Sequence, residues 1–477
     1  MSSTSELRSP LGGDGRPLFL EFRSSYIFII MVVGLSLFTD VFLYGMITPV
    51  MPDALVTRAG VPSQDREYWT SVMLIAEAVT CFVCAPICSY MIDNKSSAKR
   101  LYLFGLIMLI ASMLLFASAN SLQVYIIARM PQGAAMAMVF VAGLTLIVEC
   151  TPKDKIGYMF GYIDIFMVGG LISGPLLGGA IYHLAGYYAV FGMALILLSI
   201  DLILRLAIID KATAQKWLST QESGHESGVE NTSVTGYGSI ERSAQHNDNI
   251  VHDTSIFWRL IREPRIVISA LGILAYALLI SAFETTLPVF VVDHFHWDSL
   301  GAGCIFIPVA MTAFLGPLFG RFSDRFGPRM NTFLGFSLAT PCLICLRVVQ
   351  SNTTEHKVLL CVLLFSIGIF INAVNPAVMA EMQSAIFELE ESEPGIFGDN
   401  GAIGRTCSLQ QMTQCVGFAL GPVLGGFIDH RYGWGATTVV LGVVASAAAV
   451  PGLWLSGPKS EKSLNDDILE REPLLSV

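Results

Sequence analysis

Long apolar segments alternate with short polar segments along almost the whole chain. A transmembrane α-helix needs about 20 consecutive apolar residues to cross the hydrocarbon core of a bilayer. Twelve segments of the 477-residue chain approach this length. The first six lie at about 26–50, 68–92, 101–119, 122–149, 157–183 and 187–209, and the second six at about 266–292, 299–320, 330–349, 356–383, 404–429 and 434–456. The pattern predicts an all-α membrane protein with twelve transmembrane helices in two groups of six.

Polar segments mark the boundaries of the predicted domains. Residues 210–265 are rich in Ser, Glu, Gly, His and Asn without periodic apolar positions, which is typical of a disordered cytosolic linker. Residues 1–25 and 457–477 are polar tails. The apolar segment after the first tail is too long for the h-region of a signal peptide, so no cleavable signal is expected. The predicted domains are an N-terminal six-helix bundle at 26–209 and a C-terminal six-helix bundle at 266–456.

Lys and Arg side chains indicate the orientation in the membrane. If both termini are cytosolic, the cytosolic segments contain Arg8, Arg16, Arg23, Lys95, Lys99, Arg100, Lys153, Lys155, Arg259, Arg262, Arg265, Arg321, Arg325 and Arg329. The opposite segments then contain Arg58, Arg66, Arg347, Lys357 and Arg431. Cytosolic loops carry the excess of basic residues in membrane proteins. We therefore expect both termini in the cytosol.

Composition excludes several classes of function. Only 14% of the residues are charged, against about 25% in soluble domains. The net charge of -10 comes largely from the polar segments 222–253 and 461–472. The sequence has no stripe of basic residues that would indicate nucleic-acid binding. The sequence has no phosphate-binding loop, nucleophile–base pair or metal-ligand cluster, so we expect no enzyme, no metal and no other cofactor. The ten cysteines lie mostly in apolar segments, where we interpret them as packing residues.

Two motifs occur once in each half of the chain. Asp40 in the first apolar segment is matched by Glu284 in the seventh, and a glycine-rich motif of the fifth segment recurs in the eleventh at almost the same separation. The glycine-rich copies consist of Gly170, Gly174, Pro175, Gly178 and Gly179, and of Gly417, Gly421, Pro422, Gly425 and Gly426. Because the two copies of each motif are separated by nearly the same number of residues, the motifs indicate a duplicated six-helix unit, as in one class of membrane transporters.

The loop after the eighth apolar segment carries a family signature. It reads Gly-Arg-Phe-Ser-Asp-Arg-Phe-Gly-Pro-Arg over residues 320–329. With these motifs the chain resembles the major facilitator superfamily, specifically its twelve-span drug:proton antiporters, over nearly everything except the tails and the linker. The resemblance implies a cytosolic gate in which Asp324 caps a neighbouring helix or pairs with Arg325 or Arg329. The implied gating residues are Gly320, Asp324, Arg325, Gly327 and Arg329, with Asp93 in the matching loop of the first half, where Ser89 and Ser96 stand at the glycine positions.

Further motifs resemble the same family. Arg129, Gln132 and Gly133 in the fourth segment look like its arginine motif, which is associated with proton translocation. The glycine-rich motif of the fifth segment resembles its antiporter motif, and close helix packing is the other interpretation. Residues 40–52 and 283–288 are most similar to vesicular amine transporters and to fungal multidrug and metabolite exporters.

The chain also departs from the amine transporters. It has Glu77 where they carry Lys, and Asn372 and Gln411 where they carry Asp. The resemblance therefore does not by itself imply an amine substrate.

Ionisable residues inside the predicted spans are candidates for proton coupling. A charged side chain at the bilayer centre costs at least about 2.5–3.5 kcal/mol, so each is expected to have a function. The set is Asp40, Glu77, Asp164, Glu284 and Arg129. We hypothesise that Asp40 and Glu77 lie close together and share a proton, because two carboxylates in a low-dielectric site do not both ionise cheaply. The alternatives are that the acids cap helix breaks or pair with Arg129, and that Arg129 extends to the membrane surface.

Polar and aromatic residues of the spans indicate the substrate class. The candidate cavity residues are Tyr44, Gln132, Phe283, Asn372, Asn375 and Gln411. Several acids beside one Arg suit neutral or weakly cationic lipophilic molecules better than sugars or multiply charged anions. We therefore predict a secondary active transporter, a proton-coupled antiporter that exports lipophilic drugs or secondary metabolites. A carrier of a small organic acid or amine, and a membrane receptor or scaffold that does not transport, are the alternatives.

Short motifs concern modification and location. Asn352 begins an Asn-Thr-Thr glycosylation sequon in a predicted outer loop. Glu470, Leu474 and Leu475 resemble an acidic dileucine signal, which sorting adaptors read to direct proteins to vacuoles or lysosomes. We expect a multi-pass protein of the plasma membrane or of a vacuolar or vesicular membrane. The expected partners are a small-molecule substrate, protons and the lipid bilayer, and this fold usually works as a monomer.

Overall fold

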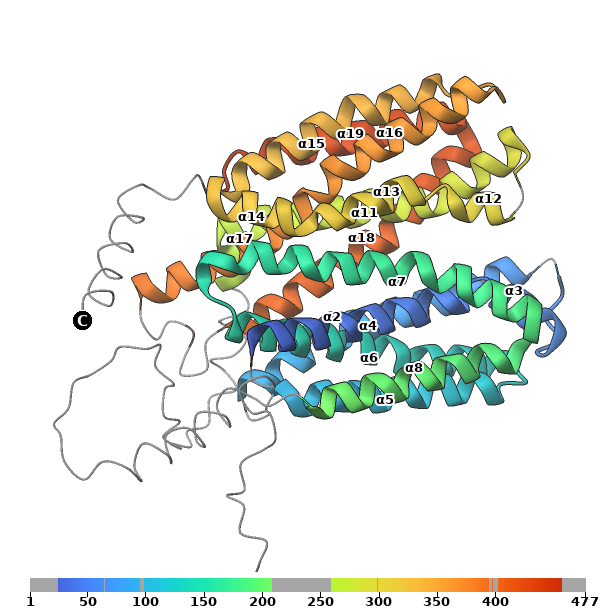
Figure 1. Cartoon of the computed structure of the whole chain (residues 1–477), viewed down its shortest axis with the longest axis horizontal. Helices are drawn as coiled ribbons and strands as arrows, with labels where there is room; N and C mark the ends of the chain where they lie inside the picture. Colours follow the sequence, from blue (N-terminus) through green and yellow to red (C-terminus); the bar gives the residue numbers. More distant parts are fainter. Residues whose placement is uncertain are drawn as a thin grey trace, which may run out of the picture.

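The computed structural model of the chain describes residues 25–63, 65–94, 98–207, 259–297, 299–393, 397 and 402–456. The predicted dileucine signal with Glu470, Leu474 and Leu475 and most of the predicted linker lie outside these residues. Every regular element of the described part is a helix. Figure 1 shows these helices in two groups that lie side by side.

The first group contains six long helices. They are α2 (Tyr26–Ile47), α4 (Arg66–Asn94), α5 (Ala98–Ser118), α6 (Leu122–Cys150), α7 (Ile156–Ala185) and α8 (Tyr187–Ala207). The short α3 (Met51–Thr57) and the 3-10 turn η1 (Lys153–Lys155) lie in the connections. Each long helix coincides with one predicted apolar segment. Such a segment is helical because the backbone in the hydrocarbon core has no water to bind and forms its hydrogen bonds within the helix.

The second group contains four continuous long helices and two interrupted ones. The continuous helices are α11 (Pro264–Phe295), α15 (Pro328–Cys345), α18 (Ile403–Tyr432) and α19 (Trp434–Gly452), with η3 (Leu346–Val348) after α15. The eighth predicted span is divided into α12 (Ser299–Cys304), α13 (Ile307–Met311), η2 (Thr312–Leu315) and α14 (Gly316–Phe326), and the tenth into α16 (Thr354–Asn372) and α17 (Val374–Ser392). Pro308 and Pro317 stand in the first turns of α13 and α14, where proline lacks the amide hydrogen that would continue the preceding helix.

The start of α11 corrects one predicted boundary. Composition places residues 210–265 in the linker, whereas α11 begins at Pro264. Pro264 suits the first turn of a helix, where its missing N–H group costs no hydrogen bond, and Arg265 forms ion pairs with α17.

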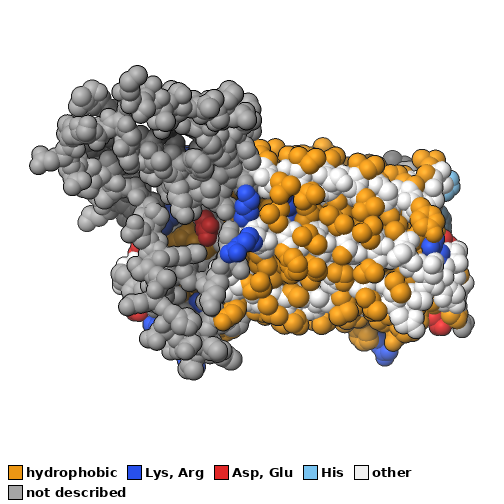
Figure 2. Space-filling model, turned by 90° about the horizontal axis from the view of Figure 1, so that it is seen from below, with side chains coloured by type: hydrophobic (Ala, Val, Ile, Leu, Met, Phe, Trp, Pro, Cys, Tyr) orange, Lys and Arg blue, Asp and Glu red, His pale blue; other side chains and the backbone are white. Residues whose placement is uncertain are grey.

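Ten helical stretches of the described residues are long and apolar enough to cross a membrane. The other two predicted spans are the interrupted α12–α14 and the polar α18, which buries Gln410, Gln411 and Gln414. Figure 2 shows hydrophobic side chains over the side of the helical body, with charged side chains toward its ends, as a lipid-facing surface requires. The predicted architecture of twelve spans in two six-helix bundles is confirmed.

Glycines of the repeated motif allow paired helices to approach closely. Gly170 and Gly174 face α2, and a Cβ atom at Gly174 would lie 2.5 Å from the carbonyl oxygen of Phe42. In the second bundle, a Cβ atom at Gly421 would lie 2.6 Å from the carbonyl oxygen of Leu278 on α11. The two copies of the motif thus make the same kind of helix contact, since small residues let backbones approach.

Substitution of Gly174 by Ala is expected to destabilise the first bundle by about 1–3 kcal/mol, because the new methyl group overlaps the backbone of α2. Gly179→Ala is the matched control, since a Cβ atom there would lie 3.9 Å from its nearest neighbour, Pro49. Both changes raise helix propensity equally, so the difference in melting temperature of the detergent-purified proteins isolates the packing effect. Equal melting temperatures would contradict this account.

Candidate functional site

An ion pair between α4 and α6 lies inside the first bundle. Arg129 Nη1 is 2.7 Å from Glu77 Oε2 and donates a hydrogen bond of 3.0 Å to Gln132 Oε1. The two helices touch here because Gly133 has no side chain: a Cβ atom there would lie 2.2 Å from the carbonyl oxygen of Glu77. Arg129 is only 1% exposed, so it points into the bundle and does not extend to the membrane surface.

The surroundings of Arg129 are aromatic and incompletely hydrogen-bonded. Its guanidinium carbon lies 5.9 Å from the ring centre of Tyr44 and 5.5 Å from that of Phe116, within the range of cation–π attraction. Arg129 Nε and Gln132 Nε2 are buried donors without a hydrogen-bond partner in the described part of the chain. Both N–H groups therefore retain the capacity to donate a hydrogen bond.

Asp40 is buried on α2, close to this ion pair. It interacts electrostatically with Glu77, but no hydrogen bond between the two is found among the described residues, and Asp40 Oδ1 has no partner there. Glu77 is instead bound to Arg129. Pairing of an acid with Arg129, one of the predicted alternatives, is thus what the structure shows for Glu77, whereas a proton shared between Asp40 and Glu77 stays a prediction.

A second buried ion pair, not among the predicted residues, lies on α8. Arg205 Nη2 is 2.6 Å from Asp201 Oδ2. Ser36 donates a hydrogen bond of 2.5 Å to Asp201 Oδ1, and Arg205 Nη1 donates one of 2.7 Å to the carbonyl oxygen of Tyr102. The pair thus connects α2, α5 and α8 one helical turn from Asp40. The signal in the sequence is an acid and a base four residues apart, on one face of an apolar helix.

Asp164 and Asn375 connect the two bundles. Asn375 Nδ2 on α17 donates a hydrogen bond of 2.8 Å to Asp164 Oδ1 on α7, and both side chains are buried. Asp164 Oδ2 and Asn375 Oδ1 have no hydrogen-bond partner in the described residues. Among the described residues, each side of the boundary between the bundles therefore retains one oxygen that can still accept a hydrogen bond.

Glu284 lies on α11 beside the buried Phe283. Its Oε1 is buried and without a hydrogen-bond partner among the described residues. Tyr276, two turns earlier on α11, interacts electrostatically with both Asp164 and Glu284. One acid from each bundle therefore lies near the same tyrosine.

The two amides that replace acidic positions of the amine transporters have different surroundings. Gln411 Nε2 on α18 donates a hydrogen bond of 3.2 Å to Cys81 Sγ on α4. This hydrogen bond joins the two bundles, as the bond between Asn375 and Asp164 does. Asn372 Nδ2 donates a hydrogen bond of 2.8 Å to Thr312 Oγ1. Asn372 therefore supports the interrupted eighth span, whereas Gln411 lies at the contact between bundles.

The bundles also touch at the predicted cytosolic end, through α7 and α14. The carboxylate of Asp324 accepts hydrogen bonds of 2.8 Å from the backbone N–H groups of Gly157 and Tyr158 at the start of α7. A Cβ atom at Gly320 would lie 2.0 Å from the carbonyl oxygen of Gly157. The structure thus shows the predicted helix capping by Asp324, which the positive end of the α7 dipole favours.

The other predicted gating residues of this signature have contacts within the second bundle. The Arg325 guanidinium carbon lies 5.4 Å from the ring centre of the next residue, and the Arg329 backbone N–H donates a hydrogen bond of 3.3 Å to the carbonyl oxygen of Ser456. Gly327 joins α14 to α15 with a φ of 85°, which glycine adopts without strain. The side chain of Asp93 in the matching loop lies outside the described part of the structure.

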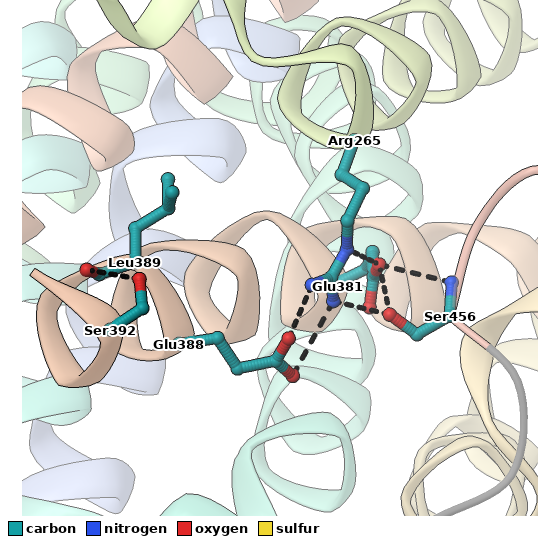
Figure 3. A network of polar contacts seen from close by, with 6 residues as sticks. All are labelled: Arg265, Glu381, Glu388, Leu389, Ser392 and Ser456. Atoms are coloured by element: carbon teal, nitrogen blue, oxygen red, sulfur yellow. Dashed lines mark hydrogen bonds and ion pairs between the residues drawn. The ribbon is translucent and has the colours of Figure 1, made fainter.

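A charged network ties the second bundle together at the same end (Figure 3). Arg265 on α11 contacts Glu388 and lies 2.9 Å from Glu381 Oε1, both on α17. Ser456, which follows α19, donates a hydrogen bond of 2.7 Å to Glu381. The network joins α11, α17 and the end of α19, and the sequence did not predict it because its members are far apart along the chain.

Asn352 lies exposed before α16. Its Nδ2 donates a hydrogen bond of 3.3 Å to the carbonyl oxygen of Phe295. Glycosylation at this position stays a prediction.

Comparisons with known proteins agree with one another. The profile of the Major Facilitator Superfamily matches residues 33–389. The MFS-type transporter ppzB of Metarhizium rileyi is 29% identical over 464 residues, which cover 91% of this chain and 95% of that protein. The vesicular acetylcholine transporter of Drosophila melanogaster is 20% identical over 450 residues, which cover 89% of this chain and 70% of that protein. The crystal structure of the human organic anion transporter MFSD10 (TETRAN) has the same fold, with a TM-score of 0.62 at 16% identity over 90% of this chain and 99% of that chain.

Removal of one member of a buried ion pair is expected to destabilise the protein strongly. Asp201→Asn leaves the Arg205 guanidinium buried without its counter-charge, which costs about 3–5 kcal/mol. The double variant Asp201→Leu with Arg205→Met is expected to lose less, because no uncompensated charge remains. Thermal unfolding in detergent measures both. Lys153→Ala is the control, since its ion pair with Glu391 is exposed and worth at most about 1 kcal/mol. If Asp201→Asn lowers the stability no more than Lys153→Ala does, the role assigned to the buried ion pair is wrong.

Hydrogen–deuterium exchange tests the cap that Asp324 of α14 forms on α7. Asp324→Ala removes the acceptor of the Gly157 and Tyr158 amides, so exchange of the peptide at the start of α7 is expected to accelerate about tenfold, as the loss of ~1.4 kcal/mol implies. Arg325→Ala is the neighbouring control, with exchange in this peptide unchanged. Identical exchange in Asp324→Ala and the wild type would rule out the cap.

Proposed function

This chain belongs to the Major Facilitator Superfamily and is a multi-pass membrane transporter, and from this premise we propose that it is a proton-coupled antiporter that exports lipophilic drugs or secondary metabolites. Its relatives named above include an MFS-type transporter and a vesicular acetylcholine transporter. We further propose that it works in the plasma membrane or in a vacuolar or vesicular membrane.

The observation that carries the proposal is a set of three buried carboxyl groups with an unpartnered oxygen. These are Asp40 on α2, Asp164 on α7 and Glu284 on α11. A buried carboxylate with an oxygen that accepts no hydrogen bond is more costly than the neutral acid. The three groups are proposed to bind and release protons. Glu77, which has a guanidinium partner, is proposed to remain a fixed charge.

Coupling to movement is proposed to depend on Asp164. Transporters of this architecture move one bundle against the other around a central site. The hydrogen bond from Asn375 to Asp164 spans the two bundles, so their relative movement changes the surroundings of this carboxyl group. Protonation of Asp164 in turn weakens a charge-assisted hydrogen bond between the bundles. Proton binding and bundle movement therefore influence each other, as linkage requires.

The charges of the site favour a neutral or weakly cationic substrate. Arg129 and Arg205 are both paired with carboxylates. Asp40, Asp164 and Glu284 form no ion pair within the part of the chain that the structure describes, although Asp40 also interacts electrostatically with Arg205. A weakly basic molecule would replace the proton on one of these acids. Tyr44 and Phe283 are proposed to supply apolar and aromatic surface for its lipophilic part.

A carrier of small organic acids is the second candidate function. It is favoured by the unpartnered donors Arg129 Nε and Gln132 Nε2, which would bind a carboxylate. The similarity to the human organic anion transporter concerns the fold alone.

Substrate-driven proton movement in proteoliposomes tests these proposals. The panel contains lipophilic cations, neutral drugs and small carboxylic acids, and a pH-sensitive dye reports the lumen. One class of compound is expected to drive proton efflux by the wild type. Asp40→Asn, Asp164→Asn and Glu284→Gln are expected to reduce this signal to background, because an amide does not bind and release the proton. Glu355→Gln, at the exposed start of α16, is the control and is expected to retain the signal.

The outcomes separate the candidates. A response to carboxylic acids alone would favour the second candidate. A wild-type signal that survives all three substitutions would remove these carboxyl groups from the mechanism. The absence of any proton signal would contradict antiport and favour uniport or a membrane receptor that does not transport.

A further inference from the structure

Two free thiols from opposite bundles meet at the contact between α4 and α18. Cys415 Sγ lies 3.4 Å from Cys81 Sγ. Both side chains are buried, and neither cysteine is in a disulfide. Gln411 Nε2 lies 3.2 Å from the Cys81 sulfur and 3.6 Å from the Cys415 sulfur, so the Gln411 amide lies beside both thiols at the boundary between the bundles.

The distance between the two sulfur atoms has to be compared with the length of a disulfide bond. The S–S bond is about 2.05 Å long, so the two sulfur atoms need to approach by about 1.4 Å. Helices α4 and α18 already pack against each other, and rotation about the Cα–Cβ bonds moves the sulfur atoms. By contrast, Cys342 and Cys345 lie on one helix, α15, and a bond between them would connect nothing new.

We infer that Cys81 and Cys415 form an oxidation site whose disulfide joins the two bundles covalently. The oxidant is a peroxide such as hydrogen peroxide, a small uncharged molecule. One sulfur attacks a peroxide oxygen, giving a sulfenic acid and one water. The second thiol then attacks that sulfur, the S–S bond forms, and the hydroxyl leaves as the second water. The two thiols lose two electrons and two protons, and the peroxide is reduced to two waters.

The consequence for transport depends on the proposed function. Alternating access requires the bundles to move against each other, and a covalent bond between α4 and α18 restricts that movement. The oxidised protein is therefore held in the conformation in which these helices touch, and a thiol reductant restores movement.

Cleavage between the bundles makes the bond visible. A protease site is inserted in the segment 208–258 of the full-length protein, which is purified, treated with hydrogen peroxide, blocked with N-ethylmaleimide and then cleaved. On a non-reducing gel the oxidised wild type is expected to migrate as one chain near its mass of 51.7 kDa, and reductant is expected to release two halves. Cys81→Ser and Cys415→Ser are expected to give two halves under both conditions. Cys88→Ser, a buried position on the same helix α4, is the control and is expected to remain linked.

Each result decides one part of the inference. Separate halves in the oxidised wild type would overturn the disulfide, as would a link that persists in Cys81→Ser. If the link forms but transport in proteoliposomes is the same before and after reductant, the restriction of movement is wrong while the disulfide stands. The gel does not depend on transport, so failure of the proposed function leaves this part intact.

Discussion

Lipid does not solvate a charge, so each ionisable side chain between the helices needs a partner or a proton. Arg129 meets this constraint through Glu77, and Arg205 through Asp201. Both pairs lie inside the first bundle, and the second also binds α2 and α5 through hydrogen bonds. The positions of α2, α4, α5, α6 and α8 therefore depend on charges that are neutralised within the protein.

The same constraint divides the interior acids into two groups. Glu77 and Asp201 have guanidinium partners and belong to the framework. Asp40, Asp164 and Glu284 each have an oxygen without a hydrogen-bond partner in the described residues. A proton is the simplest counter-charge for the second group, which links the electrostatics of the fold to the proposed mechanism.

Close helix contacts determine where polar groups from different segments meet. Gly133 brings the backbone of α6 onto α4 beside Glu77, and Gly320 brings α14 onto α7 beside Asp324. In both places a residue without a side chain lies next to a charge-assisted interaction. The bundle boundary has a related pattern. Asp164 and Gln411 occupy equivalent positions of the repeat, because each lies ten residues before the corresponding glycine, Gly174 or Gly421, and each forms a hydrogen bond with the opposite bundle. The two sides of that boundary are similar in geometry but differ in charge.

The sequence by itself determined the class and the architecture of this protein. Apolar segments of membrane-crossing length predicted the helices, and the repeated motifs predicted two similar bundles, because these features depend on residues close together in the chain. The spans that sequence pattern defines least well are the eighth, interrupted at Pro308 and Pro317, and the eleventh, where buried glutamines replace apolar residues. Only the tertiary structure decided which partner each interior charge has. The pairs Glu77–Arg129, Asp164–Asn375 and Cys81–Cys415 join segments far apart in the sequence, and no periodicity encodes such distances. The Asp201–Arg205 pair was within reach of the sequence, since four residues separate its members, but its burial against α2 and α5 follows from packing alone.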